Sequence, residues 1–550
     1  MPIKGQALTR YIFVTGGVLS SVGKGLVIAS LGKMLQVRGL KVTAIKIDPY
    51  LNVDCGTMNP YQHGEVFVTE DGGEIDLDMG HYERFLDMDL PKDQNVTTGQ
   101  IYWTVIDRER RGDYLGRCVQ IVPHITDEIK RRIYRVADRA PYDVVLTEIG
   151  GTVGDIEGLP YLEAVRQIRL EKGFENTVYV HVALVPVHDI TGEEKTKPLQ
   201  HSVNELRRIG IQPDIIVARC SRMIGSDAKA KIALFGTISG EAVYCSPNVK
   251  CVYELPLILD AEGTGDYLCR RLGIEAQKPD WNPWKTVVQS FADASQPVMI
   301  ALCGKYTSLT DSYISINEAL THAGAACGAK VKIDWIETEA FEEEPSTVER
   351  LSSYDGLLVT PGFGSRGTEG YILAANHARV RDMPYLGICF GFQLAIVAFA
   401  RHVCGLTEAS SAEVNPETPD PVLDLMPEQR ELTYKGATMR LGAHDVSIKR
   451  DTIAYRLYRS ETIRERHRHR WEVNPAYWNI LQSHGMVFSG LSPDGRRVEV
   501  FELPSSYFYM GTQFHPEFKS RPGRPDPAYY GFVKACLEKK AGRPRPQFYA

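Results

Sequence analysis

The alternation of apolar and polar positions divides the chain into two series of buried strands separated by helical stretches. The first series contains the runs YIFVTGG, KVTAIKID, YDVVLTEIGG, TVYVHVALVP and PDIIVARC, and the second contains VMIALCGKY, AKVKIDWIE, YDGLLVTPGFG and PYLGICFG. Runs rich in valine and isoleucine are typical of parallel strands, whose carboxyl ends carry functional residues. The pattern therefore predicts an α/β fold with two doubly wound domains.

A stretch with several prolines and little periodicity, AQKPDWNPWKTVVQSFADASQP, separates the two series. Because connectors between domains have this character, we expect a linker at residues 276–297. The division predicts an N-terminal domain over residues 1–275 and a C-terminal domain over residues 298–550.

Composition and charge restrict the class of protein. The 550 residues include 63 Lys and Arg against 69 Asp and Glu, a net charge of −6, which does not favour bulk binding of nucleic acid. No apolar run reaches membrane-spanning length, and the N-terminus lacks a signal-peptide core. The eleven cysteines form no CxxC pair, so neither a zinc site nor a disulfide framework is indicated. We expect a cytoplasmic protein that binds neither nucleic acid nor membrane.

One cysteine lies in a nucleophile-elbow pattern. Cys389 stands in Gly387-Ile-Cys-Phe-Gly391, where the glycines allow a sharp turn from strand to helix. Such a turn exposes the thiol, lowers its pKa at a helix N-terminus, and offers the Phe390 N–H to an oxyanion. A buried structural cysteine is the alternative.

Two further motifs favour the nucleophile. TQFHPEFKS places His515 and Glu517 two residues apart, so on a strand they would share one face as a base and its orienting carboxylate. VTPGFGSRG ends a strand in a glycine-rich loop, where Gly362 or Phe363 could supply the second oxyanion donor. In the order loop, cysteine, His-x-Glu, these motifs closely resemble the class I glutamine amidotransferase domain.

That resemblance implies hydrolysis of glutamine to glutamate and ammonia through a thioester on Cys389, with catalytic residues Cys389, His515 and Glu517. It implies that glutamine is held by Gly362, Phe390, Gly391, Phe392, Gln393, Glu413 and Arg470. Two features depart from the family pattern: Pro361 replaces the first of two adjacent glycines, and Phe390 and Phe392 replace the usual Leu and Met. The other arginines of RERHRHRWEVN are interpreted as a solvated surface, and they are Arg464, Arg466 and Arg468.

The N-terminal half contains an irregular phosphate-loop motif, TGGVLSSVGKGL. Relative to G-x-x-x-x-G-K-[ST], Gly17 stands one residue too far from Gly23, and Gly25 follows Lys24 where a hydroxyl is expected. This motif is compatible both with a phosphate loop and with a glycine-rich turn that carries a surface lysine.

Polar residues at the ends of other strands favour a phosphate site. Asp76 and Asp78 lie in a glycine-flanked loop, and Glu148 ends the strand VLTE. Carboxylates beside a phosphate loop are suitable ligands for Mg²⁺, although they could also be caps or solvated charges. Lys195, Lys197 and Gln200 in GEEKTKPLQHS could be solvated, but they also suit a second anionic substrate.

These motifs together resemble the CTP synthase family. The resemblance is carried by YIFVTGGV, SSVGKG, IKIDPYLNVDCGTMNPYQHGEVFVTEDG, DLDMGHYERF, RRGDYLG, PHIT, EIGGTVGDIE, KTKP, AKIALF and HRHRWEVN, and it runs from about Tyr11 to the end of the chain. It implies the last step of de novo CTP synthesis: ATP phosphorylates O4 of UTP, and ammonia from glutamine displaces phosphate from the 4-phosphoryl intermediate.

The resemblance also implies ligands and partners. Mg²⁺ would be the metal, ATP a co-substrate, GTP an allosteric activator and CTP a feedback inhibitor, in a homotetramer that sometimes forms filaments. His63 is similar to a residue on the family's ammonia passage, although a core histidine is an equal alternative.

The implied residues fall into three groups. The metal ligands are Asp78 and Glu148, and Lys46 supports phosphoryl transfer. The ATP-binding residues are Ser21, Val22, Gly23, Lys24, Gly25, Leu26 and Asp78. The UTP- and CTP-binding residues are Ser20, Asp155, Ile156, Glu157, Lys195, Thr196, Lys197, Pro198, Leu199, Gln200 and Lys231.

Two other functions compete with this interpretation. A different glutamine-dependent amidoligase would share the domain pairing, but KTKPLQ, GDIE and AKIALF argue against it. A catalytically silent, nucleotide-binding assembly protein is disfavoured because the candidate catalytic and metal-binding residues are all present.

Overall fold

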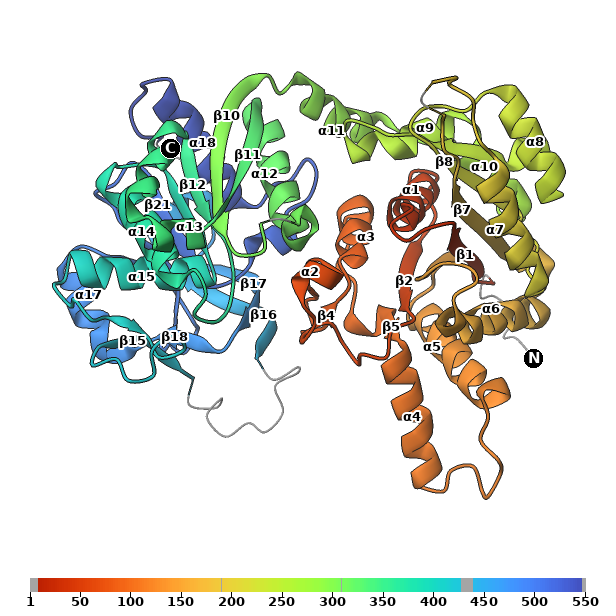
Figure 1. Ribbon diagram of the computed structural model, residues 1–550, viewed down its shortest axis with the longest axis horizontal. Coiled ribbons are helices and arrows are strands. Elements are labelled where there is room, and N and C mark those ends of the chain that lie inside the picture. The colour runs from red at the N-terminus through yellow and green to blue at the C-terminus, as the bar shows by residue number, and fades with distance from the viewer. Residues whose placement is uncertain (1–7, 189, 308, 427–438, 547–550) are drawn as a thin grey trace. The chain divides into compact units, whose positions relative to one another are not determined.

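The computed structural model describes residues 8–188, 190–307, 309–426 and 439–546, which form two compact units (Figure 1). The first unit contains the chain up to Cys55 and residues Asp78–Val288, and the second contains Gly56–Leu77 and the chain from Gln289. Within the described residues, no helix combines the length and apolar character needed to cross a membrane.

The first unit is built on a seven-stranded parallel sheet with the order β5-β2-β6-β1-β7-β8-β9. The strands are β1 (Arg10–Gly17), β2 (Val42–Asp48), β5 (Asn95–Thr97), β6 (Val144–Ile149), β7 (Thr177–Leu184), β8 (Ile215–Arg219) and β9 (Val243–Ser246). β2, β5, β6 and β9 are buried along their whole length, which explains their nearly continuous apolar character. The expected doubly wound α/β fold is confirmed here.

Helices cover both faces of this sheet. An apolar cluster joins β1, β2 and β6 to helices α4 to α6, while α1 packs against α3, α9 and the same strands. The longer helices are α1 (Lys24–Gln36), α3 (Asp78–Leu86), α4 (Thr98–Arg110), α5 (Thr126–Arg139), α6 (Leu159–Lys172), α7 (Lys197–Arg208), α8 (Ser226–Gly236), α9 (Leu255–Ala261) and α10 (Thr264–Arg271).

Helix α11 (Asn282–Asp293) lies inside the stretch expected to be a connector. Its Trp284 is buried, and the indole N–H donates to Tyr253 O at 2.9 Å. Burial of this one aromatic face explains why a segment with little apparent periodicity is helical.

The second unit is built on a nine-stranded mixed sheet with the order β11-β10-β12-β13-β21-β20-β19-β16-β17. The strands are β10 (Gln296–Gly304), β11 (Ala329–Glu337), β12 (Gly356–Val359), β13 (Tyr385–Ile388), β16 (Arg440–Ile448), β17 (Thr462–His469), β19 (Val487–Leu491), β20 (Val498–Glu502) and β21 (Tyr509–Thr512). The first five in this order are parallel, and the remainder pair antiparallel.

Separate apolar clusters cover the two faces of the second sheet. One includes α14 (Thr368–Val380) and α15 (Phe390–His402), and the other includes α12 (Ile314–Cys327) and α18 (Pro527–Lys540). The shorter helices are α13 (Glu339–Glu343), α16 (Ile453–Tyr458) and α17 (Trp478–Ser483), and a small sheet contains β14 (Ser410–Ser411), β15 (Pro421–Leu425) and β18 (Trp471–Val473).

Residues 56–77 form helix α2 (Pro60–His63) and a hairpin of β3 (Phe67–Val68) and β4 (Glu74–Ile75). Within the second unit, Phe67 packs edge-on against Phe518 with ring centroids 5.0 Å apart. The Glu65 carboxylate accepts hydrogen bonds from Ser315 N at 3.2 Å and from Ser315 Oγ, near the start of α12. An apolar contact and a helix-terminal anion thus hold the segment.

We predict that Glu65→Ala destabilises the second unit, because the buried Ser315 N–H loses a charged acceptor. The expected loss is about 1–3 kcal/mol, observed as a lower melting temperature in differential scanning calorimetry. Glu417→Ala, at an exposed carboxylate of the same unit, is the matched control. Equal melting temperatures for the two variants would contradict this anchoring role.

Candidate active sites

Cys389 lies in the turn between β13 and α15, with φ of 51° and ψ of −98°. This strained conformation matches the expected nucleophile elbow. The expected exposure of the thiol is wrong, because Cys389 is 3% exposed. A Cβ on Gly387 would lie 2.7 Å from Tyr385 Oη, and one on Gly391 would overlap Val359 O, so both glycines are required. The thiol is 3.6 Å from Gln513 Nε2 and 3.7 Å from Arg468 O.

His515 and Glu517 form the second part of this site. The expectation that they share one face of a strand is wrong, because β21 ends at Thr512 and His515 precedes a 3₁₀ helix, η11 (Pro516–Lys519). The tight turn nevertheless brings His515 Nδ1 to 2.8 Å from Glu517 Oε1. The imidazole stacks on Phe518 with ring centroids 5.2 Å apart, which fixes the ring plane.

The electrostatics favour a protonated imidazole. Burial lowers the pKa of His515, but the negative charges of Glu517 and Cys389 outweigh burial and raise it to about 10. His515 can therefore hold a proton beside the Cys389 nucleophile, with Glu517 as the carboxylate that orients it.

A cavity of about 610 Å³ opens beside His515 and Glu517. Residues on its wall that the sequence assigned to glutamine are Gly362, Glu413 and Arg470. Another part of the wall comes from the segment around Gly56, Pro60 and Val66. The cavity is therefore completed by residues far from the cysteine in sequence.

Residues 361–364 form the glycine-rich loop of the cavity wall. Glu413 Oε1 accepts from Gly364 N at 2.8 Å, and Lys305 Nζ donates to the carbonyls of Phe363 and Gly364, each at 2.7 Å. Burial lowers the pKa of Lys305 to about 8, against the opposing charge of Glu413. Sequence reasoning missed Lys305, whose only signal was its position directly after the buried run VMIALCG.

The remaining residues assigned to glutamine lie in or near α15. Phe390 packs edge-on against Tyr371, with ring centroids 5.3 Å apart, and Phe392 packs at the same separation against Phe501. Gln393 Nε2 donates to Trp471 O at 3.0 Å. The Phe390 and Phe392 departures are therefore accommodated by aromatic packing in the core.

The expectation of a solvated arginine surface is wrong for two of the three arginines. Arg466 is fully buried, donates to Val68 O at 2.9 Å and lies 3.3 Å from Glu70 Oε1. Arg468 pairs with Glu74 at 2.8 Å. Arg464 is exposed, as expected. The carboxylates that pair with these two arginines, Glu70 and Glu74, lie almost 400 residues away in sequence, so local patterns could not predict the pairs.

Burial lowers the pKa of Arg470, with Glu74 opposing and Arg468 reinforcing that change. Arg470 therefore presents positive charge to the cavity from a partly desolvated position, which suits recognition of a carboxylate.

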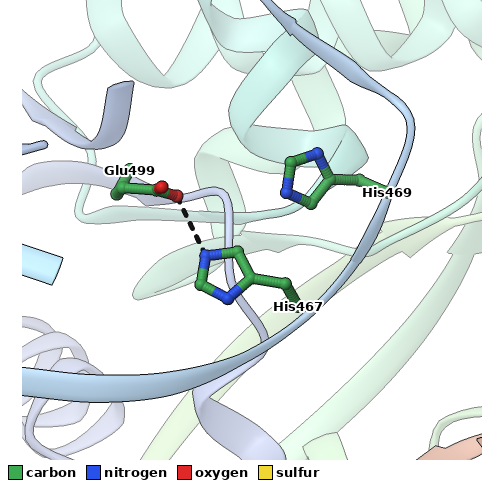
Figure 2. Close-up of side chains that lie close together, drawn as sticks. All are labelled: His467, His469 and Glu499. Carbon is green, nitrogen blue, oxygen red and sulfur yellow. Dashed lines mark hydrogen bonds and ion pairs between the residues drawn. The ribbon is translucent and has the colours of Figure 1, made fainter. Parts of the chain in front are cut away.

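Figure 2 shows His467 and His469 on one strand beside Glu499. One nitrogen or oxygen atom from each of the three residues lies within 4.8 Å of the other two. His467 Nδ1 lies 2.9 Å from Glu465 O, and His469 Nδ1 lies 3.1 Å from Trp471 O. His467 Nε2 is 2.9 Å from Glu499 Oε2, while Arg440 lies 2.7 Å from the other carboxylate oxygen. The positive charge of Arg440 compensates the negative charge of Glu499, so the cluster is satisfied internally. We interpret it as stabilising β17, the strand that ends just before Arg470.

In the first unit, the candidate residues gather where β1, β6 and β7 end. These strands are neighbours in the order β6-β1-β7, so their carboxyl-terminal loops share one edge of the sheet. The loop after β1 contains Val18 and Ser21 with φ of 78° and 56°. A positive φ at a β-branched valine indicates a strained turn.

Gly25 replaces the usual hydroxyl residue for a steric reason. A Cβ at Gly25 would overlap Asp78 Oδ1, so the carboxylate at the start of α3 occupies the space beside the phosphate loop. The departure is thus explained by a carboxylate in place of a Ser or Thr hydroxyl.

Lys46 lies among three carboxylates. It is opposite Glu148 in the β2–β6 ladder, pairs with Asp78, and lies 3.4 Å from Glu148 Oε1 and 3.6 Å from Asp48 Oδ1. Burial raises the pKa of Asp78, but Lys46, His81 and Lys24 outweigh it and lower it to about 2. Burial and the charge of Asp78 raise the pKa of Glu148.

The two acidic groups of this pair, Asp78 and Glu148, repel each other, and the hard oxygen atoms they offer fit a divalent cation such as Mg²⁺. Asp76, the other acidic residue of this loop, pairs with His63 at 3.3 Å within the segment 56–77.

Lys24 is buried, and its Nζ donates to Gly151 O at 2.9 Å in the loop after β6. The alternative of a surface lysine in a glycine-rich turn is therefore wrong, because the buried side chain links the phosphate loop to the loop that carries Asp155. In the neighbouring strand β7, His181 Nδ1 lies 2.9 Å from Thr15 Oγ1, and His181 Nε2 lies 2.9 Å from Ser202 Oγ. Burial and Lys24 lower the pKa of His181 to about 3, so it is neutral.

Most residues assigned to UTP and CTP lie in loops and helix starts that follow the parallel strands, while Lys231 lies in the middle of α8. Lys195, Lys197 and Lys231 are exposed, and Lys195 pairs with Glu193 at 2.6 Å. Thr196 precedes α7, where Pro198 lies in the first turn and Gln200 Nε2 donates to Thr196 Oγ1 at 2.9 Å. Leu199 packs in the core.

Of the other assigned nucleotide residues, Ser20 and Ser21 are exposed in the loop, Val22 is buried, and Leu26 lies in α1. Asp155 Oδ2 accepts from Thr152 N at 2.8 Å, Ile156 is exposed, and Glu157 follows in the same turn.

Comparison with known proteins identifies both halves. Residues 10–274 match the family model described as CTP synthase N-terminus, and residues 308–535 match the model described as Glutamine amidotransferase class-I. The chain is 55% identical to a CTP synthase of Pyrococcus abyssi, with 97% of this chain and 99% of the relative covered.

A CTP synthase of Thermococcus gammatolerans is 56% identical, with 97% of this chain and 100% of the relative covered. A solved structure described as the glutaminase domain of Trypanosoma brucei CTPS with bound acivicin has 35% sequence identity and a TM-score of 0.42, and covers 46% of this chain and 98% of that one. Near-complete coverage at more than half identity confirms the resemblance inferred from the motifs. The chain belongs to the CTP synthase family.

Proposed function

We propose that the protein aminates UTP to CTP with ATP and with ammonia released from glutamine. The observation that carries this proposal is the presence, in one chain, of a Cys389–His515–Glu517 constellation and of a phosphate loop beside Lys46, Asp78 and Glu148. The relatives named CTP synthase support the assignment of substrates.

Glutamine hydrolysis follows from the residues around the cavity. The Cys389 thiolate attacks the amide carbon, and the His515 imidazolium gives its proton to the departing nitrogen, which leaves as ammonia. His515 then takes a proton from water, whose oxygen breaks the thioester to give glutamate. Arg470 suits the substrate carboxylate and Glu413 suits its ammonium group, because each carries the opposite charge.

In the first unit, Asp78 and Glu148 would hold Mg²⁺, which would offset charge on the ATP phosphates. Lys24 and Lys46 place two ammonium groups near the same carboxylates, and the electrostatic interactions of Lys24 with Asp78 and Glu148 support this position. The ammonium groups stabilise charge as the phosphoryl group passes to O4 of UTP.

UTP would be bound by the exposed lysines Lys195 and Lys197, which follow β7, and CTP would bind as an inhibitor near Asp155 and Glu157. We infer a homotetramer, as membership of the family implies. Trp103 and Ile106 on α4 and nearby Leu115 are 73%, 56% and 89% exposed, and this apolar surface suits contact with another subunit. Activation by GTP and assembly into filaments belong to the same proposal.

The proposal is tested by following CTP formation by ultraviolet absorbance in mixtures of UTP, ATP, Mg²⁺ and glutamine, with and without GTP. CTP should form only when both nucleotide substrates are present, and faster with GTP. A panel of other carboxylate and lactam acceptors distinguishes a different amidoligase. Amination of one of those acceptors without amination of UTP would overturn the proposal.

We predict that Cys389→Ala abolishes glutamine-dependent CTP formation while added ammonium salt still supports it. The thiol is needed only to release ammonia, so the ammonia-dependent rate should remain within about twofold of the parent. Loss of both rates in a folded variant would contradict this division of labour.

We predict that Lys24→Ala stops CTP formation from glutamine and from ammonia alike, because both routes need phosphoryl transfer. Glutamate release without nucleotides should persist, and it serves as the internal control for folding. A normal ammonia-dependent rate would remove Lys24 from the phosphate site.

We predict that Glu517→Gln lowers glutamine hydrolysis on the order of 10²-fold or more. Without the carboxylate, burial dominates and the pKa of His515 falls from about 10, so the imidazolium is lost at lower pH. The alkaline limb of the pH–rate profile for glutamate release should therefore move to lower pH. An unchanged limb would show that Glu517 does not hold the His515 proton.

A further inference from the structure

One peptide group in the glycine-rich loop is held at both of its polar ends. The carbonyl of Phe363 accepts from Lys305 Nζ at 2.7 Å, and the N–H of Gly364, in the same peptide plane, donates to Glu413 Oε1 at 2.8 Å. A peptide bonded at both ends cannot rotate without losing two charge-assisted hydrogen bonds.

Lys305 itself is fixed by the core of the second unit. It directly follows β10, it is 1% exposed, its N–H donates to Tyr371 Oη at 3.2 Å, and its carbonyl accepts from Tyr313 Oη at 2.6 Å. Its Nζ also donates to Gly364 O at 2.7 Å and lies 4.7 Å from the centre of the Phe390 ring. The lysine therefore connects the loop to the residue that follows Cys389.

This arrangement determines which loop N–H groups can face an oxyanion. The Gly364 N–H is committed to Glu413, so the loop donor must come from Gly362 or Phe363, opposite the N-terminus of α15. If the peptide between Phe363 and Gly364 rotated, its carbonyl could turn towards the cavity and repel the negative oxygen of the tetrahedral intermediate.

We propose that Lys305 is a positioning residue for glutamine hydrolysis, which holds the oxyanion loop in its productive orientation through the carbonyls of Phe363 and Gly364. It acts through the loop and does not contact substrate. This inference rests on the glutaminase half of the proposed function and assigns that half a residue outside its motifs.

The test compares Lys305→Met, which keeps the aliphatic stem but removes the donors, with Lys305→Arg, which restores donors. Lys332→Met, at an exposed lysine on β11, is the matched control. We expect Lys305→Met to lower kcat for glutamate release on the order of 10-fold to 100-fold, with a smaller change in KM. Lys305→Arg should recover part of the loss, and Lys332→Met should match the parent.

Two further measurements separate positioning from general damage. Alkylation of Cys389 by iodoacetamide needs no oxyanion donor, so its rate in Lys305→Met should stay within about twofold of the parent. An aldehyde analogue of glutamine captures the thiol as a hemithioacetal with a charged oxygen, so its affinity should fall with kcat while glutamate affinity is retained.

Ammonia-dependent CTP formation distinguishes failure of this inference from failure of the proposed function. A parent protein that makes no CTP from ammonia contradicts the synthetase function, while glutamate release still tests Lys305. The positioning role is overturned if Lys305→Met keeps the parental kcat, or if alkylation of Cys389 and affinity for the aldehyde fall together. Failure of Lys305→Arg to recover any activity would also overturn it.

Discussion

Compensation of buried charge is the constraint on which both candidate sites depend. An isolated ionised group removed from water is strongly destabilising, so each one needs an oppositely charged or hydrogen-bonding partner. In the first unit Lys46 is surrounded by carboxylates, and in the second His515, Lys305 and Arg468 each have an acidic or carbonyl partner. Catalytic groups can therefore remain charged in places from which water is largely excluded.

The same constraint explains how residues 56–77 come to belong to the second unit. Two of their carboxylates pair with arginines of the strand that ends just before Arg470, and several of their residues line the cavity. Arg468 also places its own carbonyl 3.7 Å from the Cys389 thiol. Changes in this segment would therefore alter the electrostatics of glutamine binding, although it lies within the region that matches the CTP synthase N-terminus model.

Local sequence patterns predicted much of this structure. Buried strands produce recognisable apolar runs, and the turn at Cys389 needs small residues at fixed offsets, so the fold class and the elbow were accessible. His515 and Glu517 were paired correctly by spacing, although through the wrong backbone, because a 3₁₀ turn and a strand can both bring residues two apart together. Lys305, Arg466 and the helix around Trp284 were missed because their partners are distant in sequence or their burial depends on tertiary packing.

In the phosphate loop, the glycine at position 25 and the carboxylate of Asp78 depend on each other. In the common motif the residue after the lysine supplies a hydroxyl oxygen for the metal, whereas here a Cβ on that residue would overlap the Asp78 carboxylate, which occupies the space. Restoring Ser or Thr at Gly25 would displace Asp78, weaken its pairing with Lys46 and leave Glu148 without its neighbouring acidic group. The apparent defect and the carboxylate pair are therefore one arrangement, in which the proposed ligand oxygen would come from α3 instead of from the loop.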